Sequence, residues 1–120
     1  MKYDDLQPSE QMYFRFLKHA QAFKTKVNGH ALTPSDARFL EEVVLRDFEN
    51  RPLTVSEALT LTHLGSSATL HKRLKRLREW DLLDIQKKTS DHRTKYLIAT
   101  PLTIAHFERM GEAVQKALQG

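Results

Sequence analysis

Five basic side chains crowd into seven consecutive positions near the middle of the chain. They lie in the stretch HKRLKRLREW, residues 71 to 80, at Lys72, Arg73, Lys75, Arg76 and Arg78. Ammonium and guanidinium groups bind phosphate oxygens through charge-assisted hydrogen bonds. A helix face that contacts only water can carry the same pattern, so the run indicates a polyanion site only if the rest of the chain supports it.

The positive charge is concentrated in one part of the chain. Residues 66 to 95 contain nine Lys and Arg against four Asp and Glu, whereas the remaining residues contain ten basic and eleven acidic side chains. The net charge of +4 therefore comes from this one segment. A local excess of cations in an otherwise balanced chain favours a negatively charged partner.

Few residues support catalysis or metal binding. The chain has six histidines, at His19, His30, His63, His71, His92 and His106. They show no close paired spacing, and there is no cysteine to complete a zinc site. The GSS of residues 65–67 lacks the G-x-S-x-G pattern, and no P-loop or G-x-G-x-x-G motif occurs. We expect no enzyme activity, no metal and no cofactor, and we interpret His19 and His106 as ordinary surface residues.

Length and composition set the class of protein. A chain of 120 residues has the size of one domain and can fold without disulfides. It is 40% hydrophobic and 28% charged, which favours a helix-rich globular fold over a disordered or fibrous one. The absence of cysteine agrees with a reducing compartment, and no apolar run approaches the length of a membrane span. We expect a cytoplasmic protein that does not contact membranes.

Two helices are predicted before the basic segment. Apolar residues recur at spacings of three or four, at Met12, Phe16, Ala20, Phe23 and Val27. This spacing predicts a helix over 9–28 that stops at the Asn-Gly pair of residues 28 and 29. A second helix begins at Thr33 and Pro34, with Asp36 at its positive end. Its predicted buried residues are Ala37, Leu40, Val44 and Phe48.

The next segment explains how the basic run is presented. Pro52 breaks the chain, and Thr54 with Glu57 forms a capping box that opens a short helix through about Thr62. HLGSS is then a turn. In the following helix one face carries apolar residues, at Leu70, Leu74, Leu77 and Trp80. These residues anchor the helix and leave Lys72, Lys75, Arg76 and Arg78 outward.

A hairpin and a last helix complete the predicted elements. LLDIQKK and RTKYLIA have strand-like composition and flank the polar turn TSDH, which predicts a two-stranded hairpin. A Thr-Pro pair at residues 100 and 101 opens a helix over 100–118. Its stripe consists of Phe107, Met110, Ala113 or Val114, and Ala117 or Leu118. For the phenylalanines of the chain we favour core packing over the lining of a ligand pocket.

This order of elements is that of a winged helix-turn-helix domain: mainly α, with a small β-hairpin wing. The segments LTPSDARFL, PLTVSEA, SSATLHKRLKRLREWDLLD and SDHRTKYLIAT resemble successive landmarks of the MarR family of bacterial transcription regulators. The resemblance covers about residues 30 to 101. It implies one domain over 1–120, with a DNA-binding core over 33–99 and terminal helices that serve dimerisation.

The resemblance also implies which residues contact double-stranded DNA. The helix from Ser66 to Glu79 enters the major groove, Arg93 reaches the minor groove, and Asp91 orients the wing. The candidates for base edges are Ser67, Ala68, His71 and Lys72. The candidates for phosphates are Thr69, Arg73, Lys75, Arg76, Lys87 and Lys88. Ser66 and Lys95 complete the expected DNA-binding set.

Two features depart from the family pattern, and other functions stay open. EALTLTHLGSS is one residue longer than usual, and Asp81 stands where the family commonly has Gly. The resemblance implies a homodimeric regulator on a palindromic operator, with a small aromatic molecule as a candidate effector. One alternative is a winged-helix module that docks on an acidic protein. Another is a plasmid or phage DNA-binding protein with a role in replication.

Overall fold

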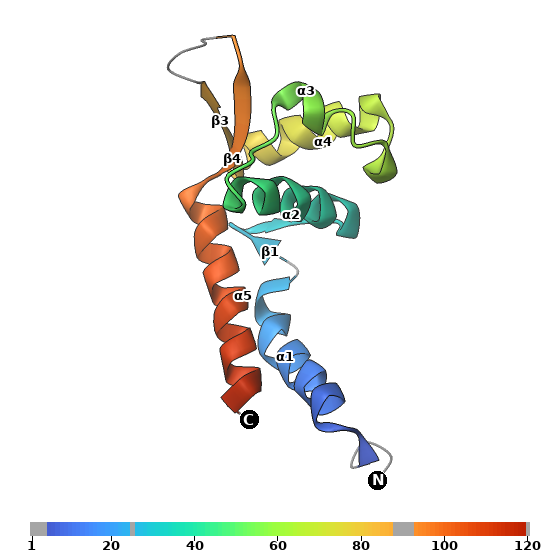
Figure 1. Cartoon of the computed structure of the whole chain (residues 1–120), viewed down its shortest axis with the longest axis vertical. Helices are drawn as coiled ribbons and strands as arrows, with labels where there is room; N and C mark the ends of the chain where they lie inside the picture. Colours follow the sequence, from blue (N-terminus) through green and yellow to red (C-terminus); the bar gives the residue numbers. More distant parts are fainter. Residues whose placement is uncertain (1–4, 25, 88–92, 120) are drawn as a thin grey trace.

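The computed structural model of this chain describes residues 5–24, 26–87 and 93–119 (Figure 1). The helices are α1 (Pro8–Lys24), α2 (Pro34–Phe48), α3 (Val55–Ala58), α4 (Ser67–Glu79) and α5 (Pro101–Gln119), with a 3-10 turn η2 (Thr62–Leu64) before α4. Strands β1 (Lys26–Val27) and β2 (His30–Ala31) form one antiparallel pair. Strands β3 (Leu83–Lys87) and β4 (Lys95–Ala99) form a second.

A hydrophobic core joins α2, α4 and the β3–β4 hairpin into one body. Its largest fully buried apolar side chains are Phe39, Leu40, Val43, Leu70, Leu77, Leu82 and Leu97. The sequence prediction that leucines anchor the basic helix is therefore confirmed. The helices α3 and α4 and the following hairpin have the arrangement of a winged helix-turn-helix, as predicted.

The predicted helix starts are confirmed at the level of single hydrogen bonds. The Thr33 hydroxyl accepts from the Asp36 backbone N–H at 3.0 Å, and Pro34 occupies the first turn of α2. At α3 the Glu57 carboxylate accepts from the Thr54 backbone N–H at 2.9 Å, and the Thr54 hydroxyl accepts from the Glu57 N–H at 3.1 Å. The bond from the Thr54 backbone lowers the pKa of Glu57. These caps satisfy amides that the first turn cannot pair internally.

The end of α4 uses a residue other than glycine in a left-handed conformation. Asp81 has φ 58°. Its N–H donates to the Arg78 carbonyl at 3.0 Å, and the Leu82 N–H donates to the Leu77 carbonyl at 2.9 Å. This is the hydrogen-bond pattern of a Schellman motif, which needs a positive φ at the residue after the cap. Asp81 takes the place that glycine usually fills.

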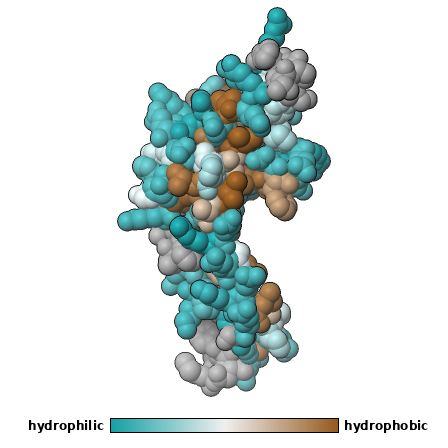
Figure 2. All heavy atoms as spheres, turned by 90° about the vertical axis from the view of Figure 1, so that its left-hand side faces the viewer, coloured by the Kyte–Doolittle hydropathy of each residue, from teal (hydrophilic) through white to brown (hydrophobic). Residues whose placement is uncertain are grey.

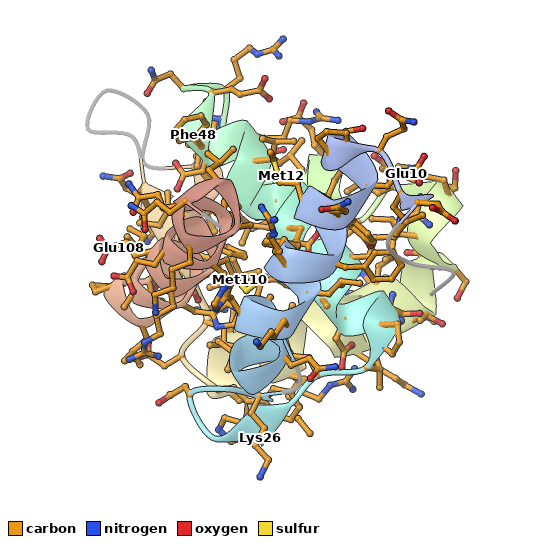
Figure 3. All side chains as sticks on the ribbon, turned by 90° about the horizontal axis from the view of Figure 1, so that it is seen from below. Glu10, Met12, Lys26, Phe48, Glu108 and Met110 are labelled. Atoms are coloured by element: carbon orange, nitrogen blue, oxygen red, sulfur yellow. The ribbon has the colours of Figure 1, made fainter. Side chains whose placement is uncertain are left out.

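Helices α1 and α5 lie side by side and form an arm that extends away from the body (Figure 1). The molecule measures 58 × 29 × 25 Å, and its radius of gyration is 16.9 Å. A compact domain of this length has a radius of gyration of about 14 Å. In Figure 3, which looks along the arm from below, Met110 points from α5 toward α1 and Glu108 lies on the outer side of α5.

The predicted first helix is too long. Helix α1 ends at Lys24, and Val27 belongs to the two-residue strand β1. Asn28 and Gly29 have φ 51° and 77° and connect β1 to β2. Two successive residues with positive φ are what a type I′ hairpin turn requires, so this Asn-Gly pair makes a hairpin and does not cap the helix.

The predicted buried stripe of α2 is displaced. The helix buries Asp36, Phe39, Leu40 and Val43, whereas Phe48 is 82% exposed. These buried positions follow the i, i+3, i+4, i+7 spacing, which turns the half-buried Ala37 and Val44 to the flank of the helix. Phe14 is exposed as well, so core packing is wrong for two of the phenylalanines.

One further prediction about a helix needs correction, and a second, which left alternatives open, is resolved. The third helix does not continue to Thr62: α3 is a single turn that ends at Ala58, and the chain resumes as the 3-10 turn η2. On α5 the fully buried apolar residues are Ala113 and Ala117, while Val114 and Leu118 are exposed. The two buried alanines have small side chains, and α5 packs against α1.

Candidate nucleic-acid interface

Helix α4 presents a polar and basic face to solvent. Its buried face carries Leu70, Leu74 and Leu77. The exposed positions are Ser67, Ala68, Thr69, His71, Lys72, Lys75, Arg78 and Glu79, of which only the last is acidic. All four residues predicted to read base edges are therefore accessible. Their contact with bases stays a prediction.

The N-terminus of α4 is capped from within the same segment. The Ser66 hydroxyl accepts from the Thr69 backbone N–H at 3.2 Å and donates to the Thr69 hydroxyl at 2.9 Å. The two side chains hold each other in one conformation at the tip of the helix. The partial positive charge of a helix N-terminus makes this tip a suitable place for a phosphate.

Arg73 does not belong to the exposed basic face. It is 8% exposed, its Nε donates to the Asp36 carboxylate at 3.0 Å, and its Nη1 donates to the Leu64 carbonyl at 3.0 Å. The prediction that Arg73 binds phosphate is therefore wrong. Arg73 lies three residues after Leu70 and four before Leu77, so the helix turns it toward the core with the leucines.

Arg76 is shared between the surface and the interior. Its Nη2 donates to the same Asp36 oxygen at 2.5 Å, and the side chain keeps 38% of its surface exposed. The guanidinium also lies over the Trp80 ring, 5.7 Å from its centroid. Trp80 in turn stacks on His30 of β2, with ring centroids 4.5 Å apart and an interplanar angle of 7°. A phosphate contact from Arg76 stays a prediction for the exposed edge of the group.

The sequence assigns Asp36 only to the N-terminus of α2 and does not reveal its contacts with Arg73 and Arg76 of α4. Burial alone would raise the pKa of its carboxyl, but hydrogen bonds from Arg76 and Arg73 outweigh burial and lower the pKa. The side chain is thus a buried carboxylate that carries its charge at neutral pH. An arginine at an inward position of a leucine-anchored helix was the available signal, because a buried cation needs an acidic partner.

The β3–β4 hairpin forms the second part of the interface. Its register runs from Leu83 opposite Ala99 to Lys87 opposite Lys95. The exposed basic side chains of the described hairpin segment are Lys87, Arg93 and Lys95. Lys88 and Asp91 lie outside the described residues, so the predicted role of Asp91 in orienting the wing stays a prediction.

Hydrogen bonds from two backbone N–H groups fix the hairpin to the body. The Leu97 N–H donates to the Leu53 carbonyl at 2.8 Å, and the Ala99 N–H donates to the Asp47 carboxylate at 3.1 Å. The hairpin and α4 both lie at the end of the molecule opposite the arm (Figure 1). The arrangement gives one end of the molecule two basic elements that differ in shape, a helix and a hairpin.

An apolar groove lies where the arm joins the body, away from α4. It has a volume of about 700 Å³ and is lined by Glu41, Val44, Leu45, Asp47, Phe48, Ala99, Ile104, Phe107 and Glu108. Figure 2 shows hydrophobic side chains gathered at this level of the molecule. Among the described residues, the lining contains three carboxylates and no Lys, Arg or His.

His106 is another residue whose prediction was wrong. It is 9% exposed on the buried face of α5 and is not an ordinary surface residue. Burial lowers the pKa of its imidazole, and the nearby Arg109 lowers it further. Across the described part of the chain, His, Asp and Glu form no group of three or more that could hold a metal ion. No helix among the described residues is long and apolar enough to cross a membrane.

Comparison with known proteins finds the fold and no sequence family. No family model and no curated protein matches the chain. The structure of transcriptional regulator Tm0710 from Thermotoga maritima matches with a TM-score of 0.60 at 17% identity, covering 92% of this chain and 70% of that one. The S. aureus MepR–DNA complex matches with a TM-score of 0.59 at 17% identity, covering 92% of this chain and 75% of that one.

A third solved structure is the heme sensor protein PefR from Streptococcus agalactiae in complex with heme. It matches with a TM-score of 0.51 at 16% identity, covering 93% of this chain and 74% of that one. Similarity at this level of identity establishes a shared fold. The winged helix-turn-helix fold that the resemblance to the MarR family implies is thereby confirmed.

Proposed function

We propose that this protein is a MarR-like transcription regulator that binds double-stranded DNA in a sequence-specific manner. The observation that carries the proposal is the exposed basic face of α4 beside the basic β3–β4 hairpin, at one end of a winged helix-turn-helix. A structural neighbour with the same fold, MepR, is a DNA complex. The exposed large hydrophobic side chains of the described residues lie on α1, α2 and α5, which argues against docking of α4 on a protein.

In this proposal α4 lies in the major groove and the hairpin lies along the neighbouring minor groove. The N-terminal half of α4 carries His71 and Lys72, whose side chains can donate to base edges. Lys75, Lys87 and Lys95 contact phosphates and fix the register of the protein on the duplex. Arg93 enters the minor groove, where a narrow A·T-rich segment has an enhanced negative potential.

We further propose that two copies bind together through their arms. The arm exposes large apolar side chains, at Tyr13, Phe14, Leu102, Ile104, Val114 and Leu118. A second copy would cover such side chains, as closed twofold dimers commonly do. Two recognition helices about 34 Å apart would then enter successive major grooves and read a palindromic operator.

The groove between α2 and α5 is the place we propose for an effector. Its lining is mostly apolar, and the charged groups among its described residues are the carboxylates Glu41, Asp47 and Glu108. An aromatic anion, as the family resemblance suggests, would meet like charge in this groove. We therefore expect an apolar effector that is neutral or positively charged. Isothermal titration calorimetry with benzoate, an aromatic anion, and with benzyltrimethylammonium, an aromatic cation, tests this expectation. Only the cation should bind.

The most informative test of the function is selection of bound duplexes from a random pool. The proposal expects enrichment of one sequence made of two inverted half-sites whose centres are separated by about ten base pairs or a multiple of that. Recovery of sequences without any shared motif would reject sequence-specific binding. Enrichment of a single half-site would retain DNA binding and reject the dimer.

A further inference from the structure

We infer that Asp36 is a positioning residue for DNA binding, because it fixes the rotation of α4 about its own axis. The inference rests on the proposed function, since the rotation of α4 decides which side chains meet the groove. Asp36 lies in the first turn of α2 and does not itself reach the surface, being 1% exposed. Its effect on DNA would therefore be exerted through the helix that it holds.

The geometry of the contact is specific to one rotation of α4. A single oxygen, Oδ1 of Asp36, accepts from Nε of Arg73 at 3.0 Å and from Nη2 of Arg76 at 2.5 Å. Arg73 also donates to the Leu64 carbonyl at 3.0 Å, in the 3-10 turn that precedes α4. The two arginines lie three residues apart on one side of α4, so turning the helix would break both bonds to this oxygen.

The leucines of α4 restrain its rotation less sharply than this contact does. Leu70, Leu74 and Leu77 bury apolar surface, and the free energy of that burial has no preferred direction. Hydrogen bonds of a planar guanidinium do have a direction, because the donors have a fixed arrangement. The leucines decide which face of α4 points inward, and the Asp36 contact fixes the exact rotation of the helix within that arrangement.

The same contact removes charge from the DNA-facing surface. Arg73 is taken into the interior and Arg76 is partly neutralised, so two of the five cations between positions 72 and 78 are committed to the fold. Lys72, Lys75 and Arg78 remain exposed. Of these, the proposed function assigns Lys72 to base edges and Lys75 to phosphates, and Arg78 follows Lys75 by three residues.

Simple removal of Asp36 would not separate positioning from stability. Asp36→Ala would leave Arg73 buried without its partner, which destabilises the fold strongly. The paired replacement Asp36→Leu with Arg73→Met removes both charges and fills the space with apolar atoms, an exchange that is often neutral for stability. This double variant keeps every exposed cation of α4.

The experiment compares the double variant with the wild type in two measurements. Hydrogen exchange without DNA is expected to be at least tenfold faster for amides of α4 and unchanged for the core of α2. In binding titrations, the ratio of affinity for the selected duplex over random duplex is expected to fall at least tenfold. The affinity for random duplex is not expected to fall, because every exposed cation is kept and Arg76 is released from its acidic partner.

A matched control uses the ion pair between Glu42 and Arg46, 3.2 Å apart on the half-exposed side of α2. Glu42→Leu with Arg46→Met removes the same charges and should leave both measurements at wild-type values. If the double variant at Asp36 fails to fold, Asp36→Asn provides the same comparison, because it keeps the side-chain shape and an acceptor oxygen. For Asp36→Asn the expected loss of the affinity ratio is about threefold, corresponding to a weakened bond.

The outcomes separate this inference from the proposed function. Wild-type exchange in α4 together with a wild-type affinity ratio in the double variant would overturn the inference and leave DNA binding intact. Failure of the wild type to bind any duplex would reject the proposed function, and the exchange measurement would still decide whether Asp36 holds α4.

Discussion

At the scale of single residues, burial decides which members of the basic run can act on a ligand. Arg73 and Lys72 are neighbours in the sequence, yet Arg73 is inside and Lys72 is outside. The helical period predicts this split once the leucine face is known, because position 73 lies between Leu70 and Leu77. The partner of Arg73 could not be predicted in the same way, since Asp36 is 37 residues away in the sequence.

The wing arginine gives the first prediction. Arg93→Ala should lower affinity for the selected duplex several-fold, because it removes a cation from the narrow minor groove. The loss should be largest for duplexes with A·T-rich flanks and small for G·C-rich flanks. Fluorescence anisotropy with the two sets of duplexes measures it.

Arg15→Ala, which removes an exposed cation from α1, provides the control. Equal losses of affinity for Arg93→Ala and Arg15→Ala would indicate a general effect of charge. Unchanged affinity and unchanged flank preference for Arg93→Ala would reject the role assigned to the wing.

His106 gives a prediction about pH. Its pKa is lowered in the folded protein, so the unfolded chain binds a proton at a higher pH than the folded chain does. The stability from this group is present above the ordinary pKa of histidine, about 6.5, and is lost as pH falls toward the folded value. Urea unfolding should therefore show lower stability at pH 5.5 than at pH 7.5.

The variant His106→Leu isolates this effect. It should flatten the dependence of unfolding free energy on pH between 7.5 and 5.5 relative to wild type. Retention of the full wild-type slope would assign the pH dependence to other groups. His71→Leu is the matched control, because His71 is exposed.

At the scale of elements, the sequence predicts what local chemistry determines. The starts of α2 and α3 are set by Thr33 and Thr54, whose hydroxyls cap the next few amides, and both were predicted. The hairpin and the leucine face of α4 follow from alternation and helical period. The displaced stripe of α2 could not be predicted, because Phe48 is as apolar as Phe39 and only packing decides which of them is buried.

The end of α4 gives an element-scale prediction. Asp81 adopts φ 58°, a conformation that glycine reaches without strain. Asp81→Gly should raise the free energy of unfolding by about 0.5 kcal/mol, and Asp81→Ala should lower it by about 1 kcal/mol. Thermal unfolding of the three proteins tests the order. A stabilising alanine would contradict the strained cap.

At the scale of the whole molecule, the arm accounts for the elongated shape. A pair of helices that extends from a body leaves each helix with an apolar side that the other does not cover. Val114 and Leu118 are exposed on α5, and their spacing of four residues puts them on one side of the helix. A second copy that covers this side of the arm stays a prediction.

The dimer is tested by changing that stripe. Val114→Lys with Leu118→Glu should raise the dissociation constant of the dimer at least tenfold, because charges would be buried at the contact. Sedimentation across a range of protein concentrations measures the change. Lys116→Glu, between the two positions on the exposed side of α5, is the control. A wild-type protein that sediments as a monomer at every concentration would remove the dimer from the account.

The central claim is that the exposed cations of α4 and the hairpin neutralise DNA phosphates, and the salt dependence of binding tests it most directly. If each copy in a dimer neutralises about four phosphates, the logarithm of affinity should fall against the logarithm of salt with a slope of roughly −7. Lys75→Ala with Lys87→Ala should reduce this slope to roughly −4, since about four contacts per dimer are lost. A wild-type slope near zero, or a slope that the double variant leaves unchanged, would contradict the claim.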